Sequence, residues 1–241
     1  MGNTEKNMVR LIVFDLDSTL APLGKGIGRK ELELFQKIEK KGIRIAIASG
    51  KTCDYLCGFM RQVGLEEPVL IGENGAVIRF GVDLPPKHYQ RISIAEDITK
   101  ALQEIRQILE KNFPHIWFQP NKIGVTPFPT SEEEFEDIQK ILDNWIKEKS
   151  GIHIFRHIDS FDIVPMGIDK VTGINYVLDK LGMTKEEMIA VGDGVNDYCM
   201  FEIAGYSVGV NVKEPDRVNK NCTSTLEMLE YLSDFVTEST K

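Results

Sequence analysis

The stretch LIVFDLDST, residues 11–19, decides how this chain folds. Its apolar half is rich in β-branched residues and predicts a buried strand over Val9–Leu16. Asp15 and Asp17 follow at positions i and i+2, which point to the same side of an extended chain. Two adjacent carboxylates cost stability unless a cation or a proton lies between them. The stretch therefore predicts a cation site, or more simply a turn in which aspartates bond to the backbone.

The sequence on either side of this stretch alternates between strand and helix patterns. Residues 30–41 and 52–63 have helical spacing of apolar side chains, and short apolar runs at 43–48 and 69–71 read as strands. Asn74-Gly75 is a hairpin signal before a return strand over 76–80. The alternation resumes near the end, with helices at 170–181, 198–204 and 224–235 and strands at 188–191 and 207–210. This order predicts a parallel sheet with right-handed crossovers.

Residues 82–165 follow a different pattern, with short strands in pairs and two helices. The predicted helices cover Ala95–Phe113 and Ser131–Lys149, and the predicted strands cover residues 88–94, 116–119, 123–126, 152–158 and 161–164. We therefore predict two domains. Residues 1–81 and 166–241 form an α/β core with a Rossmann-like parallel sheet, and residues 82–165 form an inserted α+β domain.

Two further polar segments lie at the starts of predicted helices. In ASGKT, residues 48–52, Ser49 and Gly50 lie between a strand and a helix, where fresh helix amides bind anions. Taken alone, the segment is better explained by a simple helix cap through Ser49 or Thr52, because such caps are common. Lys170 begins a later helix, a position that disfavours a cation unless a phosphate lies nearby. An exposed lysine that reaches solvent is the alternative.

The segment GDGVND, residues 192–197, again places carboxylates directly after a predicted strand. Taken alone, it is also compatible with an ordinary Gly/Asn/Asp turn. The carboxyl ends of parallel strands meet at one edge of a sheet, so Asp193, Asn196 and Asp197 are expected near Asp15 and Ser49. Carboxylates, a hydroxyl with backbone amides and one lysine are what metal-assisted phosphoryl transfer requires, and Mg²⁺ prefers oxygen ligands.

Composition limits the choice of partners. The chain has 241 residues, 42% of them hydrophobic, and its net charge is −8, which does not favour binding to nucleic acid. The first apolar run is too short for a signal peptide or a membrane span. The four cysteines lack zinc-binding spacing and are expected to be reduced thiols in a cytoplasmic protein.

In this order, DLDST, ASGKT, Lys170 and GDGVND resemble the four motifs of the haloacid dehalogenase superfamily of phosphatases. The resemblance covers about residues 8–80 and 166–240. An insertion between the second and third motifs is similar to the large cap domain of Cof-type sugar phosphatases and archaeal-type phosphoglycolate phosphatases. The segment GENGA, residues 72–76, also resembles a segment of those subfamilies.

The resemblance implies a role for each motif residue. Asp15 would be the nucleophile that forms an aspartyl-phosphate, and Asp17 would be the general acid and base. Mg²⁺ would be held by Asp15, Asp193 and the backbone oxygen of Asp17, with Asp197 supporting the metal shell. The phosphate would be bound or oriented by Ser49, Gly50, Lys170 and Asn196. The implied substrate is a small phosphorylated metabolite, either a sugar phosphate or phosphoglycolate.

Several features depart from the family pattern or leave alternatives open. Ser18 replaces a frequent glycine, and Lys51 replaces an arginine found in many Cof-type members, so their substrate choice does not transfer. Lys122 and the loop Asn121–Pro127 are candidates for substrate contact, although ordinary hairpin residues would look the same. A phosphomannomutase-like mutase and a catalytically silent metal- or phosphate-binding module are the competing functions. A homodimer is possible.

Overall fold

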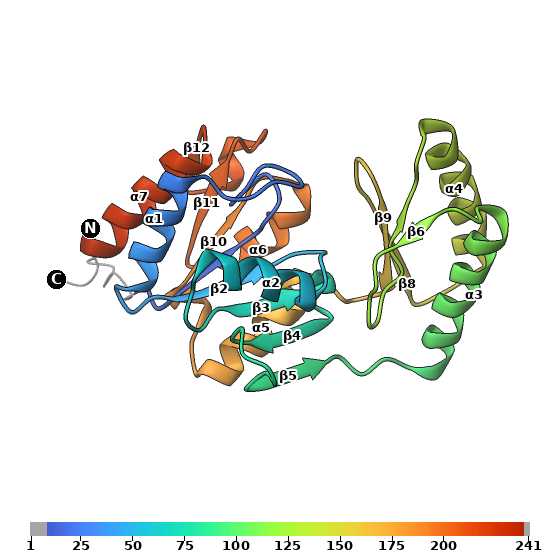
Figure 1. The fold of residues 1–241 in the computed structure, drawn as a ribbon, viewed down its shortest axis with the longest axis horizontal. Coiled ribbons are helices and arrows are strands. Elements are labelled where there is room, and N and C mark those ends of the chain that lie inside the picture. Colours follow the sequence, from blue (N-terminus) through green and yellow to red (C-terminus); the bar gives the residue numbers. More distant parts are fainter. Residues whose placement is uncertain (1–8, 239–241) are drawn as a thin grey trace.

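The structure, a computed structural model, describes residues 9–238 and contains one large sheet beside a smaller body (Figure 1). Residues 1–8 and 239–241 of the predicted core lie outside this range. The sheet has eight strands in the order β12-β11-β10-β1-β2-β3-β4-β5. From β12 to β3 every neighbouring pair is parallel, while β4 and β5 are antiparallel additions at one edge. The predicted fold class is confirmed.

Strand β1 (Leu11–Phe14) lies in the middle of the sheet because its four side chains are all apolar and fully buried. Ile12 and Phe14 pack on one face and Leu11 and Val13 on the other. Both faces must therefore be covered by helices. The first face carries α1 (Arg29–Glu39), α2 (Cys53–Val63) and α7 (Thr225–Glu238), and the second carries α5 (Lys170–Leu181) and α6 (Tyr198–Ile203).

The large sheet has seven other strands, and all of them except β12 lie close to predicted positions. They are β2 (Arg44–Ala48), β3 (Val69–Gly72), β4 (Val77–Phe80), β5 (His88–Arg91), β10 (Met188–Gly192), β11 (Tyr206–Val210) and β12 (Lys220–Cys222). Sequence patterning missed β12, whose three residues have no apolar run. The hairpin signal at Asn74 is a single 3-10 turn, η1 (Glu73–Gly75), between β3 and β4.

The smaller body has its own core. Helices α3 (Glu96–Asn112) and α4 (Glu132–Trp145) pack on two short hairpins, β6 (Trp117–Phe118) with β7 (Pro127–Phe128) and β8 (Ile152–Arg156) with β9 (Phe161–Pro165). The strand predicted at 123–126 is wrong, because the chain there makes only one bridge, Val125 to Ile163, before β7 begins.

One strand belongs to the core sheet although its residues were predicted to lie in the inserted domain. Strand β5 falls within the predicted inserted range, yet it pairs antiparallel with β4 at the edge of the core sheet. The division at 81/82 and 165/166 stays a prediction, and we propose that the inserted domain begins after β5. Between residues 9 and 238, no helix is long and apolar enough to cross a bilayer.

Candidate active site

Three adjacent strands deliver the polar motifs to one edge of the core sheet. Strand β1 pairs with β10 on one side and with β2 on the other, all parallel. Asp15 follows β1, Ser49 follows β2, and Asp193 follows β10. Helix α2 begins just beyond Ser49, and the Thr52 hydroxyl caps it by accepting from the Tyr55 amide over 3.2 Å. The carboxyl edge of the sheet therefore gathers these motifs, as a parallel sheet requires.

Lys170 ties two of these motifs together beneath the edge of the sheet. Its Nζ lies 2.6 Å from Asp15 Oδ1 and 2.6 Å from Asp197 Oδ1, and all three side chains are buried. Burial alone would lower the Lys170 pKa, but the two carboxylates outweigh it and the pKa rises. Lys170 is therefore a fixed cation at the centre of the site, and the alternative of an exposed lysine is excluded.

Asp15, Asp193 and Asp197 each place a carboxylate oxygen within 4.8 Å of the others. Burial raises the pKa of Asp15 to about 7, although Lys170 opposes the shift. Burial and the Asp197 charge likewise raise the pKa of Asp193 to about 6. Three converging carboxylates balanced by one lysine are short of positive charge, and their oxygens are the hard donors that suit Mg²⁺. The residues present therefore fit a divalent cation.

Hydrogen bonds fix the orientation of this acidic group. Asp197 Oδ2 accepts from the backbone amides of Asp193 at 3.0 Å and Gly194 at 3.2 Å. Thr19 Oγ1 donates to Asp193 Oδ1 over 3.1 Å. The Thr19 bond joins the first motif to the fourth and orients Asp193, while the two amide bonds orient Asp197 at the end of the short turn η4 (Val195–Asp197).

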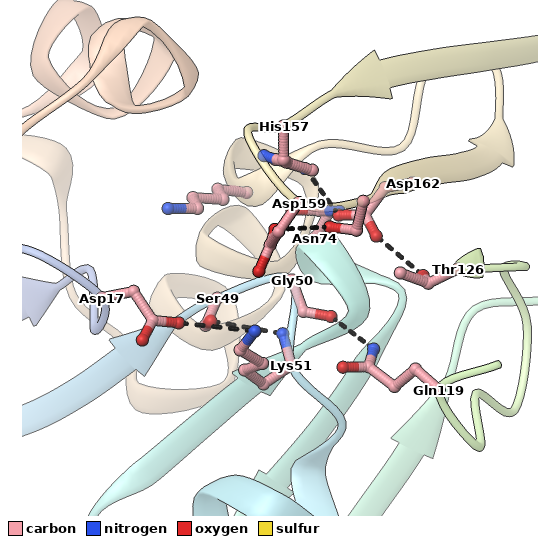
Figure 2. A network of polar contacts seen from close by, with 12 residues as sticks. Asp17, Ser49, Gly50, Lys51, Asn74, Gln119, Thr126, His157, Asp159 and Asp162 are labelled. Carbon is pink, nitrogen blue, oxygen red and sulfur yellow. Dashed lines mark hydrogen bonds and ion pairs between the residues drawn. The ribbon is translucent and has the colours of Figure 1, made fainter. Parts of the chain in front are cut away.

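Asp17 lines the same cavity, but its carboxylate is bonded to other partners than the acidic group of Asp15, Asp193 and Asp197. Lys51 Nζ is 3.6 Å from Asp17 Oδ2 (Figure 2). The Gly24 amide donates to Asp17 Oδ1 over 3.3 Å. The carboxylate is not part of the acidic group, so a metal contact through the Asp17 backbone oxygen stays a prediction. Ser18 has φ +65°, a left-handed conformation that favours glycine, which matches the glycine frequent at this position in the family.

Ser49 and Lys51 shape the loop between β2 and α2. The Lys51 amide donates to Ser49 Oγ over 3.2 Å, and the Lys51 ammonium lies 5.6 Å from the centre of the Phe128 ring. Ser49, Gly50 and Lys51 all line the cavity. The loop therefore presents a hydroxyl, backbone groups and one cation to that space.

A polar network from the inserted domain forms the opposite wall (Figure 2). Asp162 is buried, and its Oδ2 accepts from Asn74 Nδ2 over 2.7 Å while its Oδ1 accepts from Thr126 Oγ1 over 2.7 Å. His157 Nε2 lies 3.0 Å from Asp162 Oδ2. Gln119 Nε2 donates to the Gly50 carbonyl over 2.9 Å. Sequence analysis named Thr126 only as part of the loop Asn121–Pro127 and missed Gln119, His157 and Asp162, although a lone acid inside the apolar strand FDIVP was a usable signal.

Glu73 makes a second connection between the two bodies. Its carboxylate accepts from the backbone amides of Lys122 over 2.8 Å and Ile123 over 2.9 Å. Burial raises the Glu73 pKa despite these bonds. Lys122 does not line the cavity, and its Nζ lies 3.9 Å from Asp54 Oδ2. Of the predicted contact loop, Thr126 rather than Lys122 borders the cavity.

A cavity of about 240 Å³ lies between the core and the inserted domain. The predicted site residues that line it are Asp15, Asp17, Ser49, Gly50, Asp193 and Asn196. Lys170 and Asp197 lie directly behind the cavity, where Lys170 bonds to both Asp15 and Asp197. The structure thus brings all eight predicted site residues to one place.

Comparison with known proteins agrees with this geometry. The family model described as haloacid dehalogenase-like hydrolase matches residues 12–128 and 117–228. The chain belongs to this family. The predicted class of enzyme, a phosphatase of the haloacid dehalogenase type, is confirmed. Among its relatives is a phosphoglycolate phosphatase of Methanospirillum hungatei, 26% identical over 221 residues, which are 90% of this chain and 91% of that protein.

Solved haloacid dehalogenase-like structures share the whole architecture, including the inserted domain. A haloacid dehalogenase-like hydrolase from Bacteroides thetaiotaomicron superposes with a TM-score of 0.73 at 22% identity, covering 94% of this chain and 99% of that one. A Thermoplasma acidophilum protein superposes with a TM-score of 0.71 at 18% identity, covering 97% and 99%. At these identities the likeness concerns the fold.

Proposed function

We propose that this phosphatase hydrolyses phosphate monoesters of small metabolites through an aspartyl-phosphate on Asp15, with Mg²⁺ as its cation. The observation that carries the proposal is the buried bond from Lys170 to Asp15 at the floor of the cavity. Asp193 lines the same cavity, and Asp197 lies behind it within the acidic group. Relatives about 26% identical over most of their length are named phosphoglycolate phosphatases, which supports a small phosphorylated substrate.

The first chemical step is attack by an Asp15 oxygen on phosphorus. A new bond forms between that oxygen and phosphorus while the bond from phosphorus to the ester oxygen breaks. The Asp17 carboxyl donates a proton to the departing oxygen, so an alcohol leaves. Lys170 holds the Asp15 carboxylate and offsets negative charge as phosphorus is attacked.

The second step restores the enzyme. The Asp17 carboxylate, now without its proton, takes one from a water molecule as that water attacks phosphorus. The bond between phosphorus and Asp15 breaks, which releases inorganic phosphate and regenerates both carboxyl groups. Bound at Asp15, Asp193 and Asp197, Mg²⁺ would offset the charge of the phosphate and the carboxylates. Ser49, Gly50 and Asn196, which line the cavity, would hold the phosphoryl oxygens.

The test is phosphate release from an aryl phosphate, with Mg²⁺ and then with excess chelator. We expect turnover that needs the metal and falls by at least about 10³-fold in Asp15→Asn. The matched control is Asp143→Asn, an exposed aspartate on α4 that should keep wild-type activity. Acid-quenched protein should carry a phosphoryl group on Asp15, and more of it in Asp17→Asn.

Two results would overturn the proposal. Folded protein that binds Mg²⁺ but releases no phosphate from any ester would favour the silent binding module. Transfer of the phosphoryl group to a second sugar hydroxyl, without free phosphate, would favour a mutase. The homodimer and the cytoplasmic location stay predictions, and light scattering of the purified protein tests the first.

A further inference from the structure

The wall of the cavity that faces Asp15 comes from the turn between β8 and β9. Residues 157–160 and Asp162 supply most of it, and Gln119, Thr126 and Phe128 supply the rest. Two of these side chains, Asp159 and Asp162, are carboxylates. No lysine or arginine of the inserted domain lines the cavity within the described residues 9–238. This wall is therefore acidic, and it is the part of the cavity that would meet the carbon skeleton of a substrate whose phosphate lies at Asp15.

Asp159 has a free acceptor in this wall. Its Oδ1 accepts from Ser160 Oγ over 3.0 Å, and its Oδ2 accepts from no residue that the structure describes. Asp159 is exposed, and Figure 2 shows its carboxylate turned from the inserted domain toward the loop of Ser49 and Lys51. Because an ionised carboxylate only accepts hydrogen bonds, the partner it can take from a substrate is a donor such as a hydroxyl group.

The nearby basic side chains already have carboxylate partners. His157 Nε2 is 3.0 Å from Asp162, and Lys51 Nζ is 3.6 Å from Asp17. Lys170 lies below the cavity floor between Asp15 and Asp197. A second anionic group on a substrate would therefore approach Asp159 without an unpaired cation to meet it, and like charges repel.

Apolar side chains border the same space. Leu23, Phe128 and Ile158 line the cavity, and Ile158 is 87% exposed on the turn beside Asp159. These surfaces fit the C–H faces of a carbon chain or ring, while the acidic group beside them fits its hydroxyls. A two-carbon acid would use neither feature.

We propose that Asp159, supported by Ser160, selects the leaving group of the substrate. Its free oxygen accepts a hydrogen bond from a hydroxyl on the carbon skeleton, so polyol or sugar phosphates are preferred over esters that carry a carboxylate. This inference rests on the proposed phosphatase reaction. This substrate preference would distinguish the chain from the relatives that are named phosphoglycolate phosphatases.

The test uses pairs of substrates that differ only in one group. Hydroxyethyl phosphate is compared with phosphoglycolate, and glycerol phosphate with phosphoglycerate, each on the full chain with Mg²⁺. We expect kcat/KM to be at least about tenfold higher for the hydroxyl member of each pair. Asp159→Asn keeps an acceptor but removes the charge, so it should lower that ratio about tenfold, chiefly by improving the carboxylate member.

The control is Asp143→Asn, which removes one surface charge on α4 and should leave the ratio as in the wild type. A wild type that prefers the carboxylate members, or a ratio that Asp159→Asn does not change, would overturn the inference. An aryl phosphate assayed in parallel distinguishes failure of the role of Asp159 from failure of the proposed phosphatase function. Aryl turnover with a carboxylate preference refutes only the role of Asp159, whereas no turnover of any ester refutes the proposed function as well.

Discussion

Asn74 Nδ2 donates to Asp162 Oδ2 over 2.7 Å, and this buried bond joins the core sheet to the inserted domain. Asn74 sits in the turn after β3 with φ +54°, a left-handed conformation that asparagine tolerates better than most residues. Asp162 lies in β9, among apolar neighbours. The bond therefore holds the acidic wall of the cavity against the loop that carries Ser49 and Gly50.

Asn74 and Asp162 should be energetically coupled. Alanine at either position removes this bond from the other side chain, which stays buried, so we expect each variant to lose about 2 kcal/mol of unfolding free energy. The double variant should lose less than the sum, with a coupling of about 1–2 kcal/mol. Urea unfolding of the four proteins measures this, and strict additivity would show that the bond contributes nothing.

The His157–Asp162 pair should make stability depend on pH. The hydrogen bond to Asp162 raises the His157 pKa above its ordinary value, and His157 in turn helps to lower the Asp162 pKa despite burial. The His157 contribution is fully present below about pH 6.5 and is lost as the pH rises through the folded-state pKa. The stability difference between wild type and His157→Asn should thus be larger at about pH 5.5 than at about pH 8.5.

Nuclear magnetic resonance of the imidazole gives an independent measurement for the same pair. The His157 midpoint should lie above about pH 6.5 in the wild type and fall in Asp162→Asn. The contribution of Asp162 to stability is present above the ordinary pKa of an aspartate, so it does not change between about pH 5.5 and about pH 8.5. A His157 midpoint that does not respond to Asp162→Asn would contradict the assigned cause.

Glu73→Gln should loosen the inserted domain. The carboxylate accepts from the amides of Lys122 and Ile123, and charge-assisted bonds of this kind contribute about 2 kcal/mol each. Glutamine keeps one acceptor and loses the charge, so we expect a higher KM and faster proteolysis in the segments between the two bodies. Glu133→Gln, at an exposed position on α4, is the matched control and should change neither.

Lys170→Met should disable the site and destabilise the metal-free protein. Without the ammonium, Asp15 and Asp197 face each other buried and uncompensated, which costs about 3–5 kcal/mol when a buried pair loses one partner. Removal of one group that stabilises developing charge lowers kcat by about 10²–10³-fold. Thermal unfolding with chelator and turnover with Mg²⁺ measure the two effects, and wild-type stability without metal would refute the structural part.

Gly75 and Gly58 should respond in opposite directions to alanine. At Gly75, with φ +97°, a Cβ atom would clash with the Asp169 carbonyl oxygen, just before Lys170. Gly75→Ala should therefore cost more than about 2 kcal/mol and lower activity. Gly58 lies inside α2 with open space around it, so Gly58→Ala should gain about 1 kcal/mol. Urea unfolding ranks the two variants, and equal effects would contradict this account.

The sequence by itself determined the core and the grouping of its polar residues at one edge of the sheet. The apolar run of β1 needs cover on both faces, and polar groups that follow parallel strands must meet at one edge, so the strand pattern alone groups Asp15, Ser49 and Asp193. Only the tertiary structure decided the opposite wall. Asn74 and Asp162 are 88 residues apart in separate bodies, and no local periodicity encodes how one body docks on the other. The edge position of β5 was hidden for the same reason, because its pairing with β4 depends on long-range packing rather than on local pattern.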